Sequence, residues 1–141
     1  MKTAKQIQED VIDLLRGSTL REQVTGGVYP GGLRPRDSRR EDIEVIFTLG
    51  NPGQVESGVV TINVFCQDVP EGDGLTPGAK VENAMRTREI ERLLAQWVET
   101  LTPATTGGYL FTPASTILTL PEEETDRHFT SVKLKFRYYD N

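Results

Sequence analysis

Two stretches of alternating apolar and polar residues constrain the fold of this chain more than any other feature of its sequence. Segments 43–49 and 57–67 each place an apolar side chain at every second position. Successive side chains of a strand point to opposite faces, so this period predicts two β-strands. The turn-forming residues 50–53 between them predict an antiparallel hairpin. Val59 and Phe65 add apolar side chains to the second face, which predicts that both faces of the hairpin are covered.

Two helices are expected. The first spans residues 4–16, where Thr3 and Gln6 form a capping box and Gly17 ends the helix. The second is long: Thr76 would cap it, and it would run to about Leu101. Its expected apolar face consists of Val81, Met85, Ile90, Leu93, Leu94, Trp97, Val98 and Leu101.

Further strands are expected around residues 28–29 and over residues 109–120 and 128–139, with an acidic turn at 121–126. The final strand alternates core-type residues with basic ones, so its second face would meet solvent or an interface. The order α-β-β-β-α-β-β predicts one α+β domain over residues 1–141. We expect an antiparallel sheet of about four to five strands with two helices packed on one face.

Composition excludes several classes of function. The 141 residues include 16 basic and 21 acidic side chains, for a net charge of −5. This balance argues against a general nucleic-acid coat and a polybasic membrane binder. No apolar run approaches the roughly 18 residues that span a bilayer. The sequence contains no phosphate-binding loop and no dinucleotide-binding motif. We therefore expect no catalytic residue, no cofactor and no enzymatic activity.

The single cysteine and the single histidine leave one catalytic alternative. Cys66 and His128 could serve as nucleophile and base. However, Cys66 ends an apolar row and is expected to be a buried small hydrophobe, and His128 follows an acidic turn and is expected to be solvated. One cysteine also excludes a multi-cysteine zinc site.

The acidic turn contains a second candidate, a metal site. Its side chains match no known spacing of oxygen ligands, which favours a solvated hairpin tip and no metal. The residues concerned are Glu122, Glu123, Glu124 and Asp126.

The loop of residues 34–40 is the strongest functional candidate because four guanidinium groups repel one another within seven residues. The candidate interface residues are Arg34, Arg36, Arg39 and Arg40. Water and the nearby acids Asp37, Glu41 and Asp42 could compensate this positive charge. An acidic surface of a neighbouring protein, or phosphate, could do so as well. The acidic net charge favours a protein over nucleic acid.

Three stretches carry a resemblance to a known family: Gly27–Ser38, Glu41–Val45 and Gly58–Val64. Together with the order of elements, they resemble the tail-completion or tail-terminator proteins of tailed phages and prophages. The resemblance implies a virion component without enzymatic activity, assembled in the cytoplasm of a bacterial host. Such a protein forms a ring, commonly of six subunits, at the head-proximal end of the tail tube, where it stops tube growth and joins the tail to the head.

The partners implied by this resemblance are other copies of the chain, the tail-tube protein and a head-completion protein. Loop 34–40 and loop 68–78 would then contact the ring or the tube. Within the same class, a head-completion or neck protein is an alternative. From a different class, the alternative is a small binding module that holds an acidic protein or nucleic acid through Arg34–Arg40.

Overall fold

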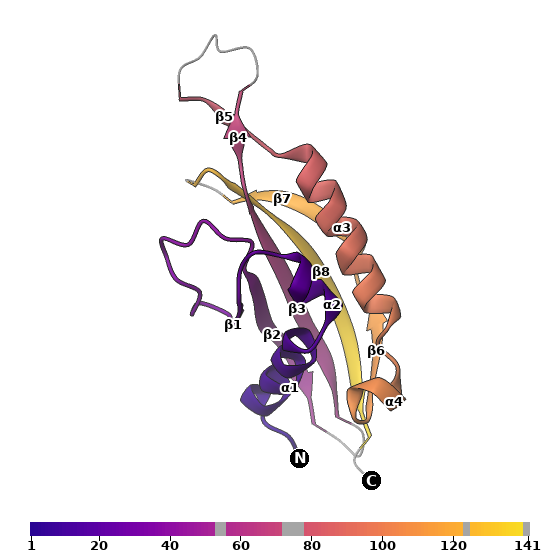
Figure 1. The fold of residues 1–141 in the computed structure, drawn as a ribbon. Coiled ribbons are helices and arrows are strands. Elements are labelled where there is room, and N and C mark those ends of the chain that lie inside the picture. Colours follow the sequence, from indigo (N-terminus) through magenta and orange to yellow (C-terminus); the bar gives the residue numbers. More distant parts are fainter. Residues whose placement is uncertain (53–55, 72–77, 123–124, 140–141) are drawn as a thin grey trace.

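The computed structural model describes residues 1–52, 56–71, 78–122 and 125–139 and confirms the α+β fold (Figure 1). Its main sheet has six strands, one more than the largest number expected. The helices are α1 (Ala4–Arg16), α2 (Thr19–Gln23), α3 (Ala84–Glu99) and α4 (Pro103–Thr106). The strands are β1 (Val28–Pro30), β2 (Ile43–Asn51), β3 (Glu56–Gln67), β4 (Val69–Pro70), β5 (Lys80–Val81), β6 (Tyr109–Pro113), β7 (Leu118–Glu122) and β8 (Arg127–Tyr138).

The main sheet has the order β1-β2-β3-β8-β6, and β7 also pairs with β8. Strands β2 and β3 form the predicted antiparallel hairpin, whereas the short β1 runs parallel to β2. The central pair joins β3 to β8 over twelve positions, from Glu56 opposite Tyr138 to Gln67 opposite Arg127. The strand nearest the end of the sequence therefore lies in the middle of the sheet (Figure 1).

One face of the sheet carries the hydrophobic core. Helix α1 begins at the predicted Thr3–Gln6 capping box and buries Ile7, Val11 and Leu15. Helix α3 adds Ile90, Leu94 and other residues, including Trp97. The sheet contributes Val28, Ile43, Val45, Val60, Ile62, Val64, Cys66, Tyr109, Phe111, Val132, Leu134 and Phe136.

The long helix begins later than expected. Helix α3 has 16 residues, which makes it about 24 Å long. The side chain of Asn83 caps it by accepting a hydrogen bond from the backbone N–H of Arg86. The expected start at Thr76 lies outside the described residues. The segment just before Asn83 forms β5, which pairs with β4. Val81 and Met85, which were expected on the apolar face of the helix, are exposed, Met85 to 85%.

The expected strand 109–120 is interrupted. Strands β6 and β7 both pair with β8, but residues 114–117 oppose only Val132 and Lys133. Pro113 has no backbone N–H to donate to β8; the N–H of Ala114 donates to the carbonyl of Lys133, and the hydroxyl of Ser115 accepts a hydrogen bond from the N–H of Lys133. The result is two short strands, β6 and β7, that flank β8 one after the other.

Candidate functional site

The four arginines of loop 34–40 have different environments. The side chain of Arg34 is only 9% exposed, and its Nη2 lies 3.2 Å from Oδ2 of Asp42, whose side chain is 1% exposed. Its guanidinium carbon lies 3.9 Å from the centre of the Phe65 ring. The structure therefore gives Arg34 a role in holding the loop on the sheet.

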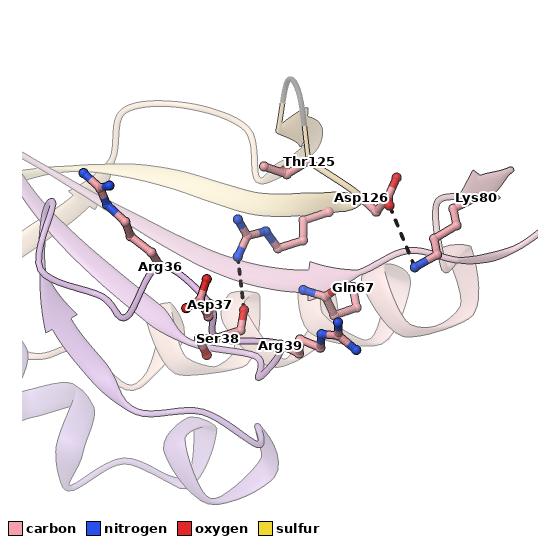
Figure 2. A pocket seen from close by; sticks show the side chains of 9 residues that line it. Arg36, Asp37, Ser38, Arg39, Gln67, Lys80, Thr125 and Asp126 are labelled. Carbon is pink, nitrogen blue, oxygen red and sulfur yellow. Dashed lines mark hydrogen bonds and ion pairs between the residues drawn. The ribbon is translucent and has the colours of Figure 1, made fainter. Parts of the chain in front are cut away.

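Arg36, Arg39 and Arg40 are exposed, and within the described residues none of them forms an ion pair. Of the three acids that the sequence offers to the loop, Asp42 pairs with Arg34 as expected, whereas Glu41 accepts two hydrogen bonds from Arg86. Figure 2 shows the side chains of Arg36 and Arg39 pointing away from each other along the rim of a pocket of about 390 Å³.

Cys66 and His128 are opposite one another in the β3–β8 pair, so they lie on the same face of the sheet. The expected solvated histidine is wrong: His128 Nδ1 lies 2.7 Å from Asp68 Oδ1, and Nε2 lies 3.6 Å from Glu82 Oε1. The expected burial of Cys66 is confirmed, and this burial raises the pKa of its thiol to about 11. A thiol with this pKa is a poor nucleophile near neutral pH.

The acidic turn is held by basic partners. Glu122 Oε1 lies 3.2 Å from Arg127 Nη2, and Asp126 lies 3.8 Å from Lys80 across the pocket of Figure 2. Glu123 and Glu124 lie outside the described residues. In the part of the chain that the structure describes, no three His, Cys, Asp or Glu side chains are grouped so that they could hold a metal ion.

The second face of the sheet, opposite α1 and α3, is a further candidate interface; no described helix contributes to it. We call it the helix-free face. On β8, Lys133, Lys135 and Arg137 alternate with the core residues and point to this face, and none of them has an ion pair among the described side chains. Apolar side chains that are exposed on the same face are Leu49, Leu110, Leu118 and Leu120.

A groove of about 840 Å³ opens at one end of the helix-free face. Phe65 and Phe129, whose ring centres are 5.9 Å apart, line it together with Arg34, Asn63 and Glu122. It shares Arg36, Thr125 and Arg127 with the pocket of Figure 2.

Sequence reasoning singled out only part of this surface. Arg127 was missed because its contact with loop 34–40 joins residues that are distant in sequence: it donates to the carbonyl of Ser38, 89 residues away. The partly apolar second face of 57–67 was the available signal for the groove, since Phe65 belongs to it.

Comparison with known proteins gives no further guide: no family model matches the chain, and no curated protein matches it. No helix in the described ranges is both long and apolar enough to cross a membrane.

Proposed function

We propose that this chain is a structural protein of phage or prophage assembly, similar to tail terminators, which self-associates into a ring. In this proposal the ring stands at the head-proximal end of the tail and joins it to the head. Its partners are further copies of the chain, the tail-tube protein and a head-completion protein. The proposal assigns the chain no enzymatic activity.

The helix-free face is the observation that carries the proposal. It combines exposed leucines, such as Leu118 and Leu120, with a row of basic side chains on β8. Exposed apolar side chains gathered on one face of a sheet are typical of a protein contact.

The charge row also favours one kind of contact. A two-fold dimer whose axis passes through the basic row would bring that row of one copy against the same row of the other, and like charges would repel. A contact between two different surfaces avoids this repulsion. Such heterologous contacts form closed rings when the rotation between neighbours closes.

Sedimentation velocity over a wide range of protein concentration tests the proposal, together with electron microscopy of the assembled species. We expect a closed ring with one stoichiometry. The double variant Leu118→Glu/Leu120→Glu should dissociate it. Met85→Glu is the matched control because Met85 is the most exposed apolar side chain of α3.

A wild-type chain that remains monomeric at every concentration would contradict the ring. The alternative from the sequence, a binding module, predicts a different result: a monomer binds an acidic peptide or an oligonucleotide. That binding would be lost when Arg36, Arg39 and Arg40 are replaced by Ser.

A further inference from the structure

Three buried polar atoms from different parts of the chain belong to residues that line the same groove. They are Arg34 Nη2, Asn63 Oδ1 and Glu122 Oε2, and none has a hydrogen-bond partner among the described residues. Asn63 is 8% exposed, and the Arg34 side chain is 9% exposed. About nine-tenths of buried polar atoms in proteins have a hydrogen-bond partner, so three unpaired ones in residues of one groove call for partners from water or from a bound molecule.

The contact between Arg34 and Asp42 does not remove this requirement. Arg34 Nε donates the hydrogen bond to Asp42 Oδ2, at 3.3 Å. The Nη2 atom lies 3.2 Å from the same oxygen without forming a hydrogen bond to it. One N–H group of the guanidinium is therefore left without an acceptor among the described residues.

The unpaired atoms define the chemistry of the occupant. Arg34 Nη2 needs an acceptor, whereas Asn63 Oδ1 and Glu122 Oε2 need donors. A phosphate or carboxylate offers only acceptors and would leave Asn63 Oδ1 and Glu122 Oε2 without a donor. An ammonium group offers only donors and would meet the guanidinium groups of the lining. A peptide unit offers an N–H donor and a C=O acceptor together and carries no net charge.

The aromatic part of the lining fits the same occupant. Phe129 is half-buried and belongs to the groove, and the face of Phe65 is already covered by Arg34. An extended chain presents alternate side chains to one surface. One apolar side chain of such a segment can pack on Phe129 while its peptide groups bond to Asn63 and Arg34.

We propose that the groove holds an extended main-chain segment of a second copy of this chain. The argument for a second copy rests on the proposed ring and on continuity: Phe129 lies on the same face of β8 as Lys133, and Leu120 is its partner across β7 and β8. A copy docked on the helix-free face therefore reaches the groove. In a ring of identical subunits, the same segment fills every groove.

Asn63→Leu tests this proposal because it should affect folding and assembly in opposite ways. An unpaired buried oxygen contributes nothing to folding, so its replacement by an apolar group leaves the melting temperature of the monomer unchanged or raises it. The loss of the hydrogen bond to the neighbour weakens assembly in sedimentation velocity, roughly ten- to hundredfold.

Thr130→Val is the matched control, because Thr130 is buried on the opposite, helix-covered face of the sheet. Its hydroxyl is bonded to that of Thr119, and it does not line the groove. This variant should lower the melting temperature and leave assembly unchanged. Glu122→Gln is a second groove variant that we also expect to weaken assembly. It keeps the test possible if Asn63→Leu does not fold.

The outcomes separate this inference from the proposed function. If the wild type forms a ring and the Asn63→Leu and Glu122→Gln variants form it equally well, then water alone pairs these atoms. In that case the groove proposal is wrong and the ring remains. A lower melting temperature for the Asn63→Leu monomer also overturns it, because the amide would then be bonded within its own chain. A wild type that never self-associates overturns both.

Discussion

Replacement of Arg34 by Ala should remove a large part of the stability of the fold, although Arg34 belongs to a loop rich in glycine and proline. The variant leaves the buried carboxylate of Asp42 with one remaining hydrogen bond, from the N–H of Gly27 at 3.1 Å. Removing one partner of a buried ion pair costs about 3–5 kcal/mol. The lost contact with the Phe65 ring acts in the same direction, and its contribution overlaps with that of the pair.

This loss can be converted to a change in melting temperature. Unfolding entropy is about 2.1 cal/mol/K per residue, which gives roughly 0.3 kcal/mol/K for a chain of this length. A loss of 3–5 kcal/mol, by the cost of a broken buried pair, therefore lowers the melting temperature by about 10–17 °C. Urea unfolding followed by the fluorescence of Trp97, the single tryptophan, measures the same loss independently.

Two companion variants make the measurement specific. Arg36→Ser should change stability by less than about 1 kcal/mol because its side chain is exposed. Asp42→Asn combined with Arg34→Ala should recover part of the loss, since the neutral amide no longer leaves a buried charge unpaired. If Arg34→Ala is as stable as Arg36→Ser, then the buried pair does not form and the loop is not held by it.

Three further variants or measurements follow from the structure. Trp97→Ala should cost about 3–5 kcal/mol in urea unfolding, because the ring is buried in the core; a loss below about 1 kcal/mol would place the ring at the surface. Cys66 should resist alkylation until urea unfolds the chain, and fast alkylation of the native chain would contradict its burial. The free energy of unfolding should fall as the pH rises from about 9 to about 11. Burial raises the pKa of the thiol in the folded chain, so the unfolded chain loses this proton first. The triple replacement of Arg36, Arg39 and Arg40 by Ser should leave the melting temperature unchanged and weaken association with other subunits or with the tail tube. Association of the wild type should weaken with added salt. A markedly lower melting temperature of the variant would show that these arginines are structural.

The parts of the fold that could be predicted depend on neighbouring residues. The capping box that fixes the start of α1 joins Thr3 and Gln6, which lie within four consecutive positions of the sequence. The period of two likewise identifies β2 and β3, because alternate side chains of each strand, such as Val45 and Ile62, are apolar and lie in the core. The start of α3 was wrong because the pairing of β5 with β4 competes with a local helix signal, and such pairing depends on distant residues.

The candidate site was less predictable for the same reason. Four arginines look alike in the sequence, and only the position of Phe65 and Asp42 beneath the loop distinguishes Arg34 from the others. His128 follows polar residues, so its neighbours predict solvent, but its partner Asp68 lies 60 residues earlier. Contacts between distant residues decided the burial of both side chains.

The central place of β8 has a consequence for how the chain folds during synthesis. Strand β2, which pairs with one edge of β3, precedes it closely in the sequence. The other edge of β3 stays unpaired until residues 127–138 have been synthesised. Until then, twelve residues with an apolar face present an unpaired edge, which is a template for aggregation. The pairing also closes a long stretch of chain, which slows folding. A polypeptide interrupted before Arg127 would therefore be expected to aggregate, and complete chains would depend on rapid capture of β3 by the last strand of the sheet.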